Sequence, residues 1–150
     1  MQGKMKKSAL EGIRVLDMTR VLAGPYCTLL LADMGAEIIK IEVPGYGDDS
    51  RKYPPFIGSE SAYFMNLNRN KKSLTLDLKA PEGKEIFYGL TRKADVVMNN
   101  FTPGTMDKLG LGYEDLKKIN PKFIWASVTG YGQTGPYRER PSYDIIVQAM

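Results

Sequence analysis

Short apolar runs alternate along this chain with longer segments whose apolar residues recur every three or four positions. Runs of the first kind are typical of buried strands, and segments of the second kind are typical of helices that bury one face. The pattern predicts strands at residues 13–18, 37–43, 73–78, 95–101 and 123–128. It predicts helices at residues 24–34, 62–67, 81–93, 103–109, 113–119 and 143–150. This alternation indicates an α/β fold in which helices cover a parallel sheet.

Two segments lack such a pattern and are predicted loops, namely residues 44–60 and 130–142, both of which contain several glycines and prolines. Loops of this length in a compact domain are often functional. The last predicted helix reaches Met150 without a capping residue, so we expect the chain to be part of a longer one.

Composition narrows the chemistry that the chain can perform. It contains no histidine, which excludes Ser-His-Asp and Cys-His arrangements within these residues. Its single cysteine, Cys27, cannot form an internal disulfide or a multi-cysteine zinc site, and we predict no metal site. Hydrophobic residues make up 43% of the chain and charged residues 25%, which is ordinary for a folded globular protein.

The net charge of +4 comes from lysines and arginines that are scattered along the chain. Because no basic run with interleaved aromatic residues is present, we expect no nucleic-acid partner. The longest apolar run, residues 29–32, is far shorter than the roughly 20 residues of a membrane span, so we expect no membrane partner. The basic first residues lack a following apolar stretch, which argues against a secretory signal and for a cytoplasmic location.

Two polar features lie beside predicted strands. Asp17 ends the first strand, at the sheet edge where α/β proteins bind ligands, and it either contacts a ligand or caps the local backbone. The segment 68–72, with the sequence Asn-Arg-Asn-Lys-Lys, precedes the third strand. It either holds phosphate groups as a cationic turn or is simply solvated. The residue patterns leave both pairs of alternatives open.

Two further motifs follow predicted strands. Residues 130–135 match G-x-G-x-x-G, but Pro136 and charged residues follow where a dinucleotide site needs a helix, so we interpret them as a glycine-rich turn. Residues 99–104 precede a short helix that carries Lys108, an arrangement that suits a phosphate. The same residues also fit a plain helix start, with Thr102 as the cap and Pro103 in the first turn, and both interpretations can hold together. Asp144 is interpreted as the cap of the last helix.

Taken in order, several segments of the chain resemble one family. The segments are residues 10–17, 23–25, 33–42, 68–74, 94–96, 100–104, 130–136 and 143–144, and the resemblance covers residues 10–150. The family is the class III coenzyme A transferases, which include formyl-CoA and carnitine CoA-transferases. The resemblance implies a Rossmann-like parallel sheet with flanking helices, which here is the incomplete N-terminal part of the family's large domain. Residues 1–9 are then a basic tail and residues 10–150 the domain part. The resemblance also implies an interlocked homodimer for the full-length protein.

The resemblance implies a transferase that moves CoA between an acyl-CoA and a carboxylic acid through an aspartyl-CoA thioester. The family's nucleophilic aspartate lies beyond Met150, so the chain holds no catalytic residue, and the 150 residues alone are expected to be inactive. No permanently bound cofactor is implied, because coenzyme A and acyl-CoA are substrates.

By position, the resemblance places part of the CoA site on ten residues. They are Val21, Leu22, Ala23, Leu76, Lys79, Asn100, Phe101, Lys108, Arg140 and Tyr143. The chain departs from the family at three positions where some members carry a cation, which here are Val43, Thr102 and Pro141. These departures leave fewer cationic contacts for the CoA phosphates, which Lys108, Arg138 or Arg140 would have to supply.

Two alternatives compete with a transferase. An α-methylacyl-CoA racemase of the same superfamily would carry a Gly-His-Asp triplet, whereas this chain has Ser142, Tyr143 and Asp144. Tyrosine, with a usual pKa near ~10, is a poor substitute for the racemase base. The second alternative is a non-catalytic fragment that binds CoA or a protein partner. The triplet favours the transferase over the racemase.

Overall fold

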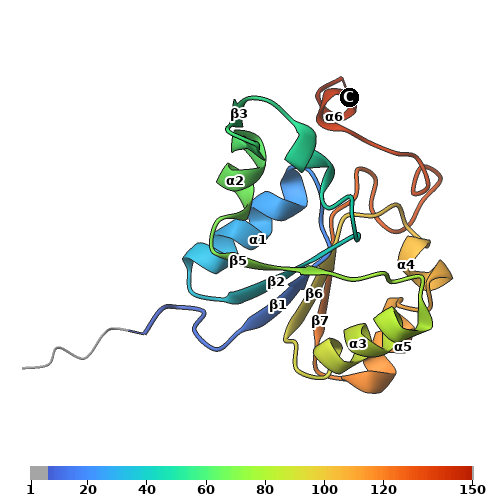
Figure 1. Cartoon of the computed structure of the whole chain (residues 1–150). Coiled ribbons are helices and arrows are strands. Elements are labelled where there is room, and N and C mark those ends of the chain that lie inside the picture. Colours follow the sequence, from blue (N-terminus) through green and yellow to red (C-terminus); the bar gives the residue numbers. More distant parts are fainter. Residues whose placement is uncertain (1–6, 150) are drawn as a thin grey trace, which may run out of the picture.

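The computed structural model describes residues 7–149, which form a five-stranded parallel sheet with helices on both faces (Figure 1). The order across the sheet is β5-β2-β1-β6-β7. These strands are β1 (Arg14–Asp17), β2 (Glu37–Glu42), β5 (Lys71–Thr75), β6 (Val96–Asn99) and β7 (Ile124–Ser127). The chain runs outward from β1 to β5 and then returns to β6 on the other side of β1, as in doubly wound folds. The predicted α/β, Rossmann-like class is confirmed.

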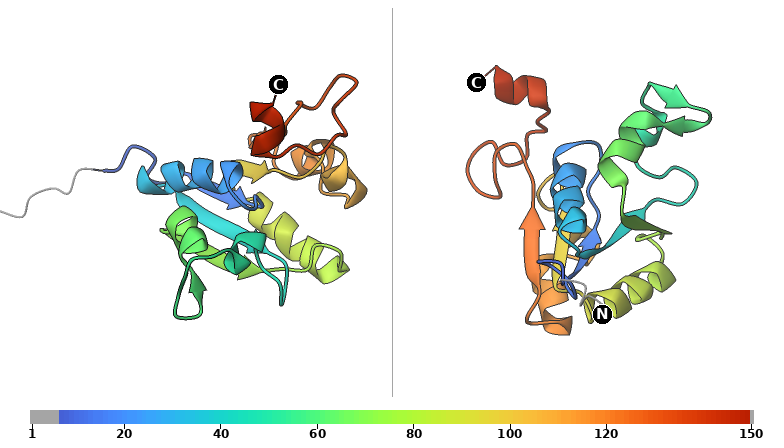
Figure 2. Two further views of the ribbon diagram at one scale, coloured as in Figure 1. Left: turned by 90° about the horizontal axis from the view of Figure 1, so that it is seen from above. Right: turned by 90° about the vertical axis from the view of Figure 1, so that its left-hand side faces the viewer.

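Helices cover both faces of the sheet, and alternate residues of each strand supply the two halves of the core. Helix α1 (Ala23–Asp33) lies on one face, and its neighbour α2 (Ala62–Asn68) packs against it. Helices α3 (Pro81–Thr91) and α5 (Tyr113–Ile119) lie on the other face (Figure 2). The core on the α1 face comprises Val15, Ala32, Ala36, Ile38 and Met98. The core on the α3 and α5 face includes Leu16, Phe87, Val97, Leu111 and Leu116.

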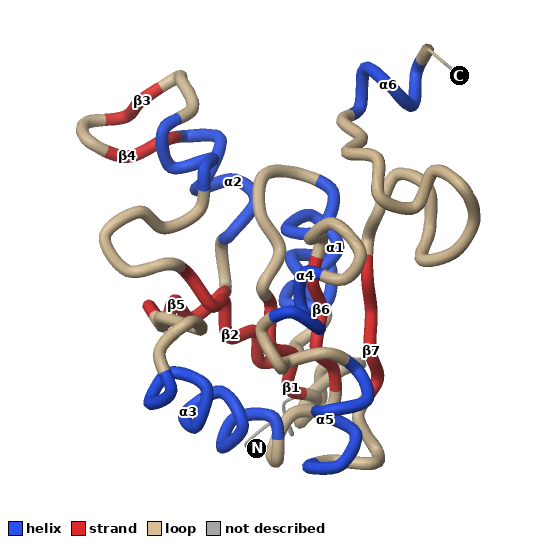
Figure 3. Tube along the Cα trace, turned by 90° about the vertical axis from the view of Figure 1, so that its right-hand side faces the viewer, coloured by secondary structure: helices blue, strands red, loops and turns tan. Residues whose placement is uncertain are grey.

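Two short helices complete the fold near the carboxyl ends of the strands. These are α4 (Thr105–Lys108), which follows β6, and α6 (Asp144–Gln148), which follows the long loop after β7. Figure 3 shows α6 and a small β-hairpin projecting from the same end of the molecule, while α3 and α5 lie at the opposite end. The carboxyl end of the sheet is therefore flanked by irregular segments from distant parts of the sequence.

The predicted loop at 44–60 contains more structure than its composition indicates. It holds a 3-10 helix, η1 (Asp49–Lys52), and the hairpin of β3 (Phe56–Ile57) and β4 (Glu60–Ser61). These elements are shorter than any window in which a hydrophobic period can be recognised. Their ends are fixed by polar contacts, since the Asp48 side chain accepts a hydrogen bond from Ser50 N–H and the Ser61 side chain accepts one from Phe64 N–H.

Several predicted boundaries are wrong by a few residues. β5 spans 71–75 instead of 73–78, because the Lys71 side chain is buried rather than solvated. β6 ends at Asn99 instead of Phe101, since the next side chain, Asn100, bonds to the β1–α1 loop. α4 begins at Thr105 after Gly104, whose φ of 81° makes it the cap in place of Thr102.

The last helix also differs from its prediction. Tyr143 is the cap of α6, and Asp144 is its first residue, with a side chain that bonds to Gln148. Residues 1–6 of the predicted basic tail, and Met150 of the predicted last helix, lie outside the described part of the chain. Between residues 7 and 149, no helix is long and apolar enough to cross a bilayer.

Candidate functional site

A cavity of about 510 Å³ lies at the carboxyl end of the sheet. It is bounded by the β1–α1 loop, the segment after β6, the loop after β7 and helix α6. Because the chain leaves β1 toward one side of the sheet and β6 lies on its other side, this is the switch point at which doubly wound proteins bind ligands.

The cavity brings together seven of the ten residues that the resemblance assigns to CoA. They are Val21, Leu22, Ala23, Asn100, Phe101, Arg140 and Tyr143. The other three do not line it. Leu76 is 7% exposed and packs in the core, whereas Lys79 and Lys108 are exposed on the surface. Of the positions that depart from the family, Thr102 and Pro141 line the cavity and Val43 is exposed.

The backbone of the β1–α1 loop is held by side chains from other elements. Arg20 N–H donates to Asn100 Oδ1 at 2.9 Å, and Asn100 Nδ2 donates back to the Arg20 carbonyl at 2.7 Å. Val21 N–H donates to Asp48 Oδ1 at 3.1 Å. Lys40 Nζ donates to the Thr19 carbonyl at 2.8 Å. Three consecutive residues thus depend on side chains far away in the sequence for their backbone hydrogen bonds.

Val21 has a φ of 70°, in the left-handed region. A β-branched side chain is strained there, and such strain persists only where the surrounding structure over-determines the backbone. The hydrogen bonds of the Arg20 backbone with Asn100 and of Val21 N–H with Asp48 provide that constraint. Val21 is followed by Leu22 and Ala23, which line the cavity and begin α1.

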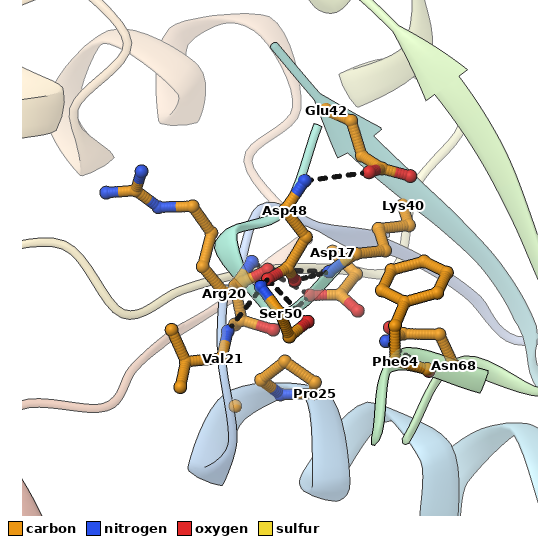
Figure 4. Close-up of polar contacts among 12 residues, drawn as sticks. Asp17, Arg20, Val21, Pro25, Lys40, Glu42, Asp48, Ser50, Phe64 and Asn68 are labelled. Carbon is orange, nitrogen blue, oxygen red and sulfur yellow. Dashed lines mark hydrogen bonds and ion pairs between the residues drawn. The ribbon is translucent and has the colours of Figure 1, made fainter. Parts of the chain in front are cut away.

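Two buried ion pairs lie beneath this loop. Lys40 Nζ is 2.8 Å from Asp48 Oδ2, and the two side chains are 1% and 0% exposed (Figure 4). Lys71 Nζ is 3.2 Å from Asp17 Oδ2, again with side chains 1% and 0% exposed. Because two lysines balance two aspartates, the cluster has no net charge, which buried ions require.

Asp17 is saturated by contacts within the protein. Besides Lys71, its carboxylate accepts hydrogen bonds from the hydroxyls of Thr19 at 2.5 Å and Thr28 at 2.6 Å, and from Thr19 N–H at 2.9 Å. It is fully buried and does not line the cavity. Of the two alternatives that the sequence left open, the structure supports a carboxylate that fixes local backbone.

The environment shifts the pKa values of the buried network. Burial alone would raise the pKa of Asp48, but the Lys40 ammonium and the hydrogen bonds from Ser50 outweigh it and hold this pKa below its usual range. Burial lowers the pKa of Lys71, although the Asp17 carboxylate opposes that shift. The pKa of Glu42 is lowered despite its burial, because Arg51, Ser73 and the Asp48 N–H all bond to it.

The cavity walls carry two arginines, Arg20 and Arg140, and two aspartates, Asp49 and Asp144. The Arg20 guanidinium lies 5.3 Å from the ring centroid of Phe101 and 3.4 Å from Asp49 Oδ2. The Arg20 and Asp49 side chains are 43% and 30% exposed, so solvent screens their attraction. A bound carboxylate or phosphate can therefore compete with Asp49 for Arg20.

Comparison with known proteins identifies the family of the chain. Residues 10–150 match the model of CoA-transferase family III. The chain belongs to this family. It is 54% identical over 142 residues to the succinyl-CoA:glutarate CoA-transferase of Mus musculus, which aligns 94% of this chain with 33% of that protein. It is 53% identical over 144 residues to the acetyl-CoA:oxalate CoA-transferase of Acetobacter aceti, which aligns 96% of this chain with 37% of that protein.

Solved structures agree with this membership. A CaiB/BaiF family protein from Brucella suis superposes with a TM-score of 0.90 at 44% identity, covering 96% of this chain and 39% of that one. The chain thus spans between a third and two fifths of the length of these relatives.

The cationic segment 68–72 lies outside the cavity. Lys71 is buried against Asp17, while Arg69 pairs with Asp33 at 2.6 Å. Lys72 pairs with Glu37 at 2.6 Å. All three cations of the segment therefore have carboxylate partners within the chain, and none lines the cavity. Simple solvation, one of the two interpretations of the sequence, is wrong for Lys71, because its side chain is buried.

The glycine-rich segment 130–135 is a turn, as predicted, because no helix begins until Asp144. Gly130 lies against Ser142, so that a Cβ at residue 130 would overlap the serine side chain. This close packing joins the start and the end of the loop, and both residues line the cavity.

Sequence reasoning missed Lys40 and Asp48 as site-forming residues. A signal for Lys40 was present, because it stands two residues after Ile38 and therefore shares that residue's buried face of β2. No comparable signal exists for Asp48, which stands in an irregular segment. Glu42, on the same face of β2, holds that segment in place by binding Arg51 through two contacts of 2.7 Å.

Proposed function

We propose that the whole protein transfers CoA from an acyl-CoA to a carboxylic acid, and that this chain supplies part of the CoA site. The observation that carries the proposal is the cavity at the switch point, where separate segments of a family III chain converge. Its Phe101 ring offers an apolar surface, and its arginines offer guanidinium groups to anions.

In the proposed reaction, an aspartate of the whole protein that lies C-terminal to Met150 attacks the acyl-CoA carbonyl. A mixed anhydride forms and the CoA thiolate leaves. The thiolate then attacks the aspartyl carbonyl, which gives the aspartyl-CoA thioester and releases the first acid. The acceptor acid then undergoes the same steps in the reverse order, so that CoA is transferred to it and the aspartate is freed. This chain's part is to hold CoA close to the anhydride, since a retained thiolate reacts at a high effective concentration.

We further propose that the acceptor is a dicarboxylic acid. Relatives with 44–54% identity are named for glutarate, oxalate, mesaconate and malate, all of which are dicarboxylic acids. The carboxylate that does not react stays ionised and needs a cation. Arg20 is the candidate, because its guanidinium lies at the cavity and its one ion pair in the described part of the chain, with Asp49, is screened by solvent. In keeping with the family, we also propose a homodimer in the cytoplasm.

An activity assay of the whole protein tests the proposed function. With succinyl-CoA as donor, we expect CoA to be transferred to dicarboxylic acids of two to five carbons and not to monocarboxylic acids of similar length. Borohydride or hydroxylamine added during turnover should trap an aspartate derivative beyond residue 150. Exchange of the α-proton of a branched acyl-CoA without any transfer would instead support a racemase. CoA binding without either reaction would support a non-catalytic protein.

Lys108→Ala tests the part of the CoA site that lies outside the cavity. Lys108 is exposed at the end of α4 and makes no ion pair within the described residues, so its charge is available to a phosphate of CoA. We expect this variant of the whole protein to bind CoA roughly tenfold to a hundredfold more weakly in calorimetry. Lys118→Ala, at another exposed lysine, is the control and should bind normally. Equal affinity in both variants would remove Lys108 from the site.

A further inference from the structure

We propose that the buried Lys40–Asp48 pair is a positioning device for the cavity-lining segment Arg20–Ala23, in addition to any contribution it makes to stability. The inference deepens the proposed function, since the ligand whose binding it controls is CoA. It concerns two residues that do not line the cavity and that act through the backbone of the β1–α1 loop.

The two members of the pair bind the loop backbone on the two sides of Arg20. Asp48 Oδ1 accepts from Val21 N–H at 3.1 Å, and it also accepts from the Ser50 N–H and hydroxyl at 2.9 and 2.7 Å. Lys40 Nζ donates to the Thr19 carbonyl at 2.8 Å while it pairs with Asp48 Oδ2. The pair therefore joins the loop to β2 and to the segment around η1 at one buried point (Figure 4).

Asp48 binds the loop at Val21, which is the residue with the strained backbone. Arg20 is fixed by the Asn100 amide, and the chain then turns at Val21 with a φ of 70° before Leu22 and Ala23 reach the cavity. If Asp48 released the Val21 N–H, valine would relax toward negative φ, where it is unstrained. That rotation would redirect Leu22 and the start of α1 relative to Arg20. The geometry of the cavity thus depends on a bond made by a buried carboxylate.

Stability alone gives a weak reason for such a pair. Desolvation of two buried ions offsets most of their attraction, and apolar replacements of both partners are often as stable or more stable. An apolar pair could fill this volume but could not accept from Val21 or donate to Thr19. This difference separates a positioning role from a structural one.

The test compares two double variants of the whole protein. Lys40→Met with Asp48→Leu removes both charges and the acceptor for Val21. We expect its melting temperature to stay close to that of the parent, while CoA binds about tenfold more weakly or worse in calorimetry, because small misplacements of binding groups have effects of this order. Hydrogen exchange at residues 19–23, measured without ligand, should become faster. Lys40→Met with Asp48→Asn restores the acceptor without the charge and should recover most of the affinity and protection.

Leu116→Ala is the matched control, because Leu116 is fully buried in α5, on the face of the sheet opposite α1. It should lower the melting temperature and leave CoA affinity and exchange at residues 19–23 unchanged. Unchanged exchange and affinity in the Met/Leu variant would overturn the inference. Failure of both double variants to fold would overturn it as well, since the pair would then serve the fold itself. If the parent protein binds no CoA, the proposed function fails, and the exchange measurement still decides the positioning role.

Discussion

Asp17→Ala is expected to lower the free energy of unfolding by about 3–5 kcal/mol, the range found when one partner of a buried ion pair is removed. The variant leaves the Lys71 ammonium without its counter-ion, and the Thr19 hydroxyl loses its acceptor. The Thr28 hydroxyl keeps only its longer contacts with the carbonyls of Gly24 and Pro25. Urea unfolding of the whole protein at neutral pH measures the effect.

Asp33→Ala is the control for this prediction. Asp33 also pairs with a cation, Arg69, but the two side chains are 33% and 51% exposed. Exposed ion pairs contribute roughly 0–1 kcal/mol, so this variant should unfold almost as the parent does. Similar losses for Asp17→Ala and Asp33→Ala would contradict the role assigned to the buried cluster.

Lys40→Met, made alone, is expected to lower the free energy of unfolding by about 3–5 kcal/mol at neutral pH, because the Asp48 carboxylate remains ionised and buried without a counter-ion. This expectation contrasts with the double variant in which both charges are replaced. Denaturant unfolding compares the single variant, the double variant and the parent. Lys72→Met, which breaks an ion pair whose lysine is 71% exposed, should have little effect.

The loss in Lys40→Met should depend on pH in a defined direction. In the parent, the pKa of Asp48 is below that of the unfolded chain, so its stabilisation is present above about pH 4 and is lost as the pH falls through the folded value. In the variant, burial is no longer opposed by Lys40, so the pKa of Asp48 is higher than in the parent. The folded variant then takes up a proton as the pH falls, and the penalty diminishes. The difference from the parent should therefore shrink between neutral pH and about pH 4. A difference that stays constant would contradict this account.

The sequence predicts the order of strands and helices well because their hydrophobic periods are long enough to recognise. Segments such as 37–43 and 81–93 carry a clear apolar face, and the structure places a strand and a helix there. A charged residue causes one of the errors. The segment with Lys71 suggests a cationic turn, either phosphate-binding or solvated, yet the structure buries Lys71 in β5 against Asp17. No local pattern reveals such a partner, because the two residues are far apart in the chain and meet only when the sheet forms.

The candidate site is predictable to a similar degree. The resemblance names Asn100 and Phe101, and the switch point of the sheet brings them beside the β1–α1 loop. The groups beneath the loop are harder to predict, because Asp48 acts through a hydrogen bond to a backbone N–H rather than through contact with the cavity. Backbone conformation at Val21 is not encoded in its own side chain, which disfavours a positive φ.

Asn100 holds Arg20 through an amide that both accepts and donates. This two-way bonding makes the loop sensitive to a change of a single group. Deamidation to aspartate would keep the acceptor for the Arg20 N–H but would set a carboxylate oxygen against the Arg20 carbonyl, so that an attraction becomes a repulsion between two acceptors. Slow chemical ageing at this one side chain would therefore weaken the attachment of the cavity-lining loop at Arg20, while the contacts of Asp48 and Lys40 and the hydrophobic core stay in place.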